Sequence, residues 1–211
     1  LGFNASHFYD SPGTYTVTLT LTNEAGKTSC ATSTVTVQSA ARQVIYVSNE
    51  GSDSNGGTSS GSPVRSFSKA ASIVAGKSNM EILFKAGETF TTTTSMIIYG
   101  QNVVVGSYGS GRATIKYTGS KNYSAIFWLG ASGGGQDTVR DLIVDSSYTS
   151  VSDAQGMPQG VGISGVGDTV INCEFLNLDY AVNLSAGPSG VLIHDNTAPL
   201  RTGLREYFVW S

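Results

Sequence analysis

From residue 80 onward, short apolar runs alternate with stretches rich in Gly, Ser, Asn, Asp and Thr. The runs are too short for helices of normal length, so they predict β-strands separated by turns. The expected strands cover residues 81–84, 96–99, 103–105, 113–117, 125–129, 138–144, 160–164, 169–175, 180–184, 190–194 and 206–210.

The runs also repeat. The segment DTVRDLIVDS at residues 137–146 aligns with DTVINCEFLN at 168–177, which sets Val139 opposite Val170. The segment SGVLIHDNTA at 189–198 fits the same frame with Ile193 opposite Val170, so the two steps are 31 and 23 residues. A period in the low twenties, built from short strands, is typical of one coil of a β-solenoid. One coil cannot bury its inner face, so each coil needs its neighbours for a core.

A different pattern precedes the strands. A short strand is expected at residues 44–48, followed by a polar loop at 49–62. Ser66 is then a candidate N-cap, and Gly76 is a candidate stop for a short helix between them. Its apolar positions are spaced as one helical stripe: Phe67, Ala70, Ala71 and Val74.

A third pattern occupies the beginning of the chain. Two alternating strands flank the turn at residues 23–26, and Tyr15, Val17 and Leu19 point to one side while the threonines between them point to the other. The apolar side requires a partner layer.

The opening of the second region resembles a known family. The segments IYVSNEGSDSNGG…SPVRSFSKAAS, ILFKAGETF and VVVGSYGSGRATI resemble the start of right-handed parallel β-helix proteins of the pectate-lyase-like superfamily. The resemblance covers residues 43–118 well and the later repeats more loosely. It implies a β-helix over residues 40–211 whose first coil is covered by the helix, and a superfamily of polysaccharide lyases, glycoside hydrolases, tailspikes and adhesins.

The segment SPGTYTVTLTLTNEAG at residues 11–26 resembles the last strands of a PKD-type immunoglobulin-like sandwich. Such a sandwich needs about seven strands, more than residues 1–39 can supply. We therefore expect an all-β chain that begins inside one domain, the partial sandwich, and ends inside the next, the β-helix. Unpaired strand edges at such ends would also permit self-association.

Composition narrows the function classes. Charged residues make up 13% of the chain, about half the usual share. The formal net charge of −3 gives no support for nucleic-acid binding, and no apolar stretch reaches the roughly 18 residues of a membrane span. With the two resemblances, this composition favours a secreted or cell-surface bacterial protein. Cys30 and Cys173 fall in different regions, and we do not expect them to form a disulfide.

One loop has the spacing of a possible calcium site. Asp53 and Asn55 place side-chain oxygens at alternate positions before two glycines. The alternative, which we favour, is a loop held by its own side chains.

Candidates for catalysis are few. A polysaccharide lyase must neutralise a uronate carboxylate and remove the neighbouring proton, tasks for calcium or basic groups and for Arg, Lys or His. Arg201, Arg205 and His194 are the weak candidates, although the two arginines also fit a solvated loop and His194 a plain surface position. The wider set of charged groups in the repeats is Arg140, Asp141, Asp145, Glu174, Asp179 and Asp195.

Two features suggest carbohydrate binding. Aligning Leu129 with Ile163 and Leu184 puts Phe127, Val161 and Val182 inside. The same alignment points Trp128, Gly162 and Asn183 outwards in one column. An exposed Trp beside an amide suits a sugar ring. The alternatives are that Trp128 covers the bare backbone of Gly162 or, with a shift of one residue, is buried.

The second feature is the longer step of the repeat. Its excess lies in residues 146–159, where we expect an exposed excursion presenting Tyr148 and Asp153.

Two functions follow. In the first, the chain is the front part of an exported protein that binds or degrades a polysaccharide, with most catalytic residues beyond Ser211. In the second, it is a non-catalytic surface, adhesin or filament protein.

Overall fold

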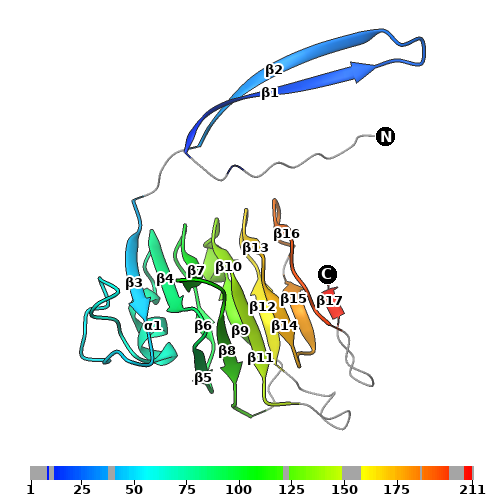
Figure 1. The fold of residues 1–211 in the computed structure, drawn as a ribbon. Helices are drawn as coiled ribbons and strands as arrows, with labels where there is room; N and C mark the ends of the chain where they lie inside the picture. Colours follow the sequence, from blue (N-terminus) through cyan, green and yellow to red (C-terminus); the bar gives the residue numbers. More distant parts are fainter. Residues whose placement is uncertain are drawn as a thin grey trace. The chain divides into compact units, whose positions relative to one another are not determined.

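The computed structural model describes residue 9 and residues 12–37, 41–120, 124–148, 158–185, 187–199 and 207–210. The chain divides into two compact units, Leu1–Ala41 and Arg42–Ser211. Each is considered by itself (Figure 1).

The first unit contains an antiparallel hairpin of β1 (Gly13–Thr22) and β2 (Thr28–Val37). The turn between them is closed by Asn23, whose side-chain oxygen accepts hydrogen bonds from the backbone N–H groups of Ala25 at 3.0 Å and Lys27 at 2.9 Å. Gly26 adopts the left-handed conformation that this turn requires, with φ of 74°. The hairpin predicted from the alternation is therefore present.

The apolar side of this hairpin is open to solvent. Val17 is 42% exposed and Leu19 58%, and Leu19 lies opposite Ala31 across the strands. A two-stranded sheet has no second layer and cannot bury either face. No partner layer covers this side among the described residues of the unit.

The second unit is built from three parallel sheets. The first sheet has the order β16-β13-β10-β7-β4-β3, the second β14-β11-β8-β5, and the third β17-β15-β12-β9-β6. The strands of the first sheet are β3 (Gln43–Val47), β4 (Met80–Lys85), β7 (Val104–Tyr108), β10 (Thr138–Arg140), β13 (Thr169–Ile171) and β16 (Leu192–His194). Those of the second are β5 (Thr89–Thr92), β8 (Ala113–Tyr117), β11 (Leu142–Ser146) and β14 (Glu174–Leu176). Those of the third are β6 (Met96–Ile97), β9 (Ala125–Leu129), β12 (Gln159–Ile163), β15 (Tyr180–Leu184) and β17 (Tyr207–Trp210).

The chain visits the sheets in a fixed order. From β4 it passes to β5 in the second sheet and β6 in the third, and then returns to the first sheet with β7. The circuit repeats through β7–β9, β10–β12 and β13–β15. Neighbouring strands in a sheet are therefore one circuit apart in sequence, which explains the repeats and their period (Figure 1).

The register agrees with the sequence alignment. Val139 pairs with Val170, and Val170 pairs with Ile193. In the third sheet, Phe127, Val161 and Val182 lie in one row and are fully buried. Ile163 is also fully buried, while its partner Leu184 is half-buried against the core.

Two of the expected strands are in fact broken at a corner. The runs at 138–144 and 169–175 each contribute one strand to the first sheet and one to the second. Asp141 and Asn172, with φ of 56° and 51°, stand at the breaks. Asp and Asn tolerate the left-handed region, so they turn the chain between two apolar stretches. Strand β5 was not predicted, because its sequence TFTT contains a single apolar residue.

The short helix forms as predicted. Helix α1 (Phe67–Val74) is capped at its N-terminus by Ser66, whose Oγ accepts a hydrogen bond from the backbone N–H of Lys69 at 3.0 Å. Gly76 follows its end with φ of 69°. Its buried residues are Phe67, Ala70 and Val74. The helix contacts β3, β5 and β6, the edge strands of the three sheets, and also β4. A single-turn 3₁₀ helix (Ala131–Gly133) follows β9. No helix in the described part of the chain has the length and apolar character to span a bilayer.

Two carboxylates are buried where the chain enters the first sheet. Asp137 and Asp168 are both fully buried and lie one circuit apart. Asp137 accepts a hydrogen bond from the Val103 N–H at 2.8 Å, and its own N–H donates to Asp168 at 3.0 Å. Burial raises the pKa of Asp137 to about 7, although hydrogen bonds from the backbone N–H groups of Val103 and Gly130 act to lower it, and the Asp168 charge adds to the rise. Burial also raises the pKa of Asp168.

Candidate functional site

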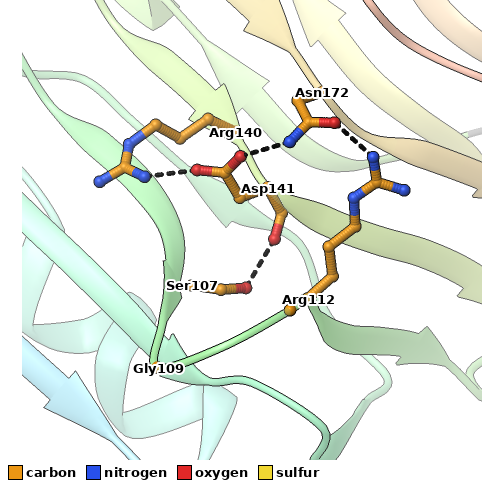
Figure 2. A pocket seen from close by; sticks show the side chains of 7 residues that line it. Ser107, Gly109, Arg112, Arg140, Asp141 and Asn172 are labelled. Carbon is orange, nitrogen blue, oxygen red and sulfur yellow. Dashed lines mark hydrogen bonds and ion pairs between the residues drawn. The ribbon is translucent and has the colours of Figure 1, made fainter.

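A polar hollow lies at the corner where the chain leaves the first sheet for the second. Its volume is about 410 Å³. It is shaped by three consecutive circuits, because its lining comes from the ends of β7, β10 and β13 and from the turn before β8. The lining residues are Ser107, Gly109, Gly111, Arg112, Arg140, Asp141 and Asn172 (Figure 2). We call this the corner hollow.

Four side chains of the corner hollow form one hydrogen-bonded chain (Figure 2). Arg140 Nη1 is paired with Asp141 Oδ2. The Asn172 side-chain amide donates to the other oxygen of Asp141 at 2.7 Å. Arg112 Nη2 donates to Oδ1 of the Asn172 side-chain amide. The chain of bonds therefore joins a guanidinium, a carboxylate, an amide and a second guanidinium.

Two more carboxylates adjoin this chain. Glu81 Oε1 is 2.9 Å from Arg140 Nη2, and Glu174 Oε2 is 3.8 Å from Arg112 Nη1. Burial acts to lower the pKa of Arg140, but the hydrogen bonds and charges of Asp141 and Glu81 outweigh it, and the net pKa is raised. The groups around Arg140 are thus negatively charged.

Small residues and tight backbone contacts hold these side chains in place. Gly106 lies beneath Arg140, and a Cβ at residue 106 would come within 3.0 Å of Arg140 Cγ. The Ser107 hydroxyl donates to the Asp141 carbonyl oxygen at 2.6 Å and accepts from the Ala113 N–H at 2.8 Å. Ser107 therefore ties together the corners of two circuits, and its polar groups are already used.

The predicted Trp column is in register, but the side-chain N–H donors of Trp128 and Asn183 already make internal hydrogen bonds. Trp128 pairs with Gly162, which pairs with Asn183. Trp128 is half-buried, its Nε1 donates to Ser164 Oγ at 3.1 Å, and a Cβ at residue 162 would lie 2.7 Å from its ring. The indole thus covers the bare backbone of Gly162, as the first alternative stated.

Asn183 and Tyr148 were expected to contact a sugar. In the structure both side chains make contacts within the protein. Asn183 is 8% exposed, and its amide donates to Gln159 Oε1 at 2.8 Å. Tyr148 is half-buried against the core, and its hydroxyl donates to the Gly119 carbonyl oxygen at 2.6 Å. Asp153 and most of the expected excursion lie outside the described residues.

The candidate calcium loop is held by its own side chains. Asp53 Oδ1 accepts from the N–H groups of Arg65 at 2.9 Å and Ser66 at 2.8 Å, and Oδ2 accepts from the Ser66 hydroxyl at 2.7 Å. Burial tends to raise the pKa of Asp53, but these hydrogen bonds outweigh it and lower the pKa overall. The amide of Asn55 donates to the Pro63 carbonyl oxygen at 2.9 Å. In the described part of the chain, no three His, Cys, Asp or Glu residues cluster as metal ligands would.

Of the three catalytic candidates, His194 is the one that lies among the described residues. His194 is half-buried, and its Nδ1 is hydrogen-bonded to Asp195 Oδ2 at 2.7 Å. Arg201 and Arg205 lie outside the described residues. Cys173 is buried, which raises the pKa of its thiol to about 12, and both Cys30 and Cys173 are free.

Arg140, Asp141 and Glu174 belong to the wider set of charged groups identified from the sequence. Arg112 and Asn172 were not predicted. A signal for Asn172 was present, because the 31-residue step aligns it with Asp141. Two polar residues that occupy the same position in successive circuits must lie side by side. Arg112 has no counterpart in the aligned repeats, so only the fold reveals it.

Comparison with known proteins identifies one part of the chain. Residues 2–38 match the family model of the PKD domain. No curated protein matches the chain, and no solved structure matches it.

Proposed function

We propose that residues 42–211 form part of a right-handed parallel β-helix of the pectate-lyase-like type, with α1 as the cover of its first coil. The repeated circuit through three parallel sheets supports this proposal. So does the position of α1 against the edge strands of all three sheets, where an open end would expose core and strand edges.

We further propose that this β-helix binds an extracellular polysaccharide at the corner hollow. The observation that carries the proposal is the bonded chain of Arg140, Asp141, Asn172 and Arg112 along an open hollow. These planar side chains offer donors and acceptors in fixed directions, which suits the closely spaced hydroxyl groups of a sugar.

The geometry of the circuits also suits a polymer. Successive strands in a sheet lie about 4.8 Å apart, so a polar row that crosses three circuits is about as long as one or two sugar rings. The half-buried Trp128 is the proposed second contact, on the third sheet, with Asn183 predicted beside it. Tyr148 and Asp153 were predicted as separate contacts on the excursion at residues 146–159. The PKD match is consistent with an extracellular or cell-surface location.

For the described residues we propose polysaccharide binding. Cleavage by a lyase or hydrolase would call on further groups, most of which were predicted to lie beyond Ser211, with Arg201, Arg205 and His194 as the weak candidates within the chain. Binding without cleavage is also what the alternative, a non-catalytic surface or filament protein, would require.

The test is calorimetric titration of the chain with a panel of oligosaccharides, repeated with Arg112→Gln. Arg112 is half-buried and its side chain bonds within the corner hollow, so the variant should lose binding by about tenfold, the worth of one hydrogen bond from a charged group. Lys77→Gln, an equal charge change at an exposed residue, should bind as the wild type does.

The proposal fails if no member of the panel binds. It also fails if binding is unchanged in Arg112→Gln while circular dichroism shows an intact fold. Trp128→Ala tests the second contact in the same way, and unchanged affinity would remove Trp128 from the site.

A further inference from the structure

The charges around the corner hollow favour one class of sugar over another. The cluster contains two guanidinium groups, on Arg112 and Arg140, and three carboxylates, on Glu81, Asp141 and Glu174. It therefore carries one net negative charge at neutral pH.

The arginines are not free to serve an anionic ligand. Arg140 already contacts two carboxylates, Asp141 and Glu81. Arg112 is bonded to Asn172 and lies 3.8 Å from Glu174. A ligand carboxylate approaching Arg112 would share it with Glu174, and like charges that meet in a partly buried site repel each other.

A neutral ligand carries no charge for these carboxylates to repel. Hydroxyl groups donate and accept, so they can bond to Asp141 or Glu174 as donors and to Arg112 or Asn172 as acceptors. The alternation of donor and acceptor side chains along the hollow matches adjacent hydroxyls of a sugar ring (Figure 2). The carboxylates that disfavour an anion become useful partners for a neutral sugar.

We infer that the corner hollow takes a neutral sugar unit with adjacent hydroxyl groups, rather than a uronate. This inference rests on the proposed function, because it names the class of sugar for the same site.

The experiment compares neutral oligosaccharides with their uronate counterparts of equal length, by titration at about 50 and 500 mM NaCl. Neutral members should bind, and their dissociation constants should change by less than about twofold with salt, since no ligand charge is screened. Uronate members should bind at least about tenfold more weakly at low salt, where repulsion is least screened.

A charge-reversing variant sharpens the test. Glu81→Gln combined with Glu174→Gln keeps the side-chain shapes and changes the net charge of the cluster from −1 to +1. Uronate binding should then improve by about tenfold or more, and the preference of the site for neutral members should be lost. Glu24→Gln, at an exposed residue in the turn of the hairpin, is the control and should leave both unchanged.

The outcomes separate the two proposals. Tighter binding of uronates by the wild type, weakened by salt and lost in Arg112→Gln, would overturn the inference and leave polysaccharide binding at this site standing. Absence of binding by both classes, or binding insensitive to Arg112→Gln, would overturn the proposed function and the inference with it.

Discussion

The buried carboxylate of Asp137 should give the protein an unusual dependence of stability on pH. Its pKa rises from 3.8 to about 7 in the folded state, which corresponds to about 4 kcal/mol at about 1.4 kcal/mol per pKa unit. Below about pH 4 the group is protonated in both folded and unfolded chains, and burial costs little. Above about pH 7 it is ionised in both, and the folded state bears the full cost of the buried charge.

The folded state therefore holds one more proton than the unfolded state between these limits. Its free energy of unfolding should fall by up to about 1.4 kcal/mol per pH unit on account of this group as the pH rises from 4 to 7. In Asp137→Asn the group cannot ionise. The variant should be less stable than the wild type at pH 4, because the new amide replaces an oxygen that accepts from the Gly130 N–H at 3.3 Å. Relative to the wild type, the free energy of unfolding of the variant should rise by up to about 4 kcal/mol as the pH approaches 7.5.

Urea denaturation at several pH values measures the difference in free energy of unfolding between the two proteins, from which the titrating groups that do not interact with Asp137 cancel. Asp53→Asn is the matched control. The pKa of Asp53 is lowered in the folded state, so its contribution to stability is present above its usual pKa and disappears as the pH falls below that value. A difference between Asp137→Asn and wild type that stays constant from pH 4 to 7.5, or that moves in favour of the wild type, would refute the reasoning.

Two further predictions concern the positions that define the fold. Ser66→Ala removes the N-cap of α1 and the hydroxyl partner of Asp53, and should lower the free energy of unfolding by about 1–2 kcal/mol, whereas Ser68→Ala, exposed on the same helix, should have little effect. Equal melting temperatures for the two variants would contradict the capping role. Gly100→Ala should cost about 3 kcal/mol or more, because its Cβ would lie 1.9 Å from the Lys77 carbonyl oxygen. Gly61→Ala, where a Cβ meets nothing within 4 Å, is the control, and a Gly100→Ala protein as stable as that control would show that the close approach relaxes without cost.

The sequence by itself predicted the elements and their pairing. Apolar runs that recur in the same order along the chain must pair with one another, because only stacking buries their inner faces. This was enough to place Val139 opposite Val170 and Phe127 in a row with Val161 and Val182. Local chemistry was equally direct at α1, where Ser66 and Gly76 are start and stop signals whatever surrounds them.

The sequence could not show where one apolar run bends from sheet to sheet. Asp141 and Asn172 read as polar interruptions of single strands, and only the positions of the neighbouring circuits make them corners. Strand β5 was not predicted for a related reason. Its threonines are held in the sheet by pairing with β8, and their own hydrophobicity gives no signal for a strand.

The candidate site could be predicted from the sequence to a smaller extent than the strands and their pairing, because it depends on tertiary contacts. Arg112 and Asn172 are 60 residues apart in the chain and are joined by a hydrogen bond only because three circuits stack at one corner. The same stacking turned Trp128 onto Gly162 and Asn183 towards Gln159, contacts that depend on side-chain direction and not on register. Periodicity determines which residues share a row, because the strand repeat and the step of the circuit are properties of the chain itself. Which polar groups in that row face each other, and with what net charge, is decided by the corner geometry that long-range packing imposes.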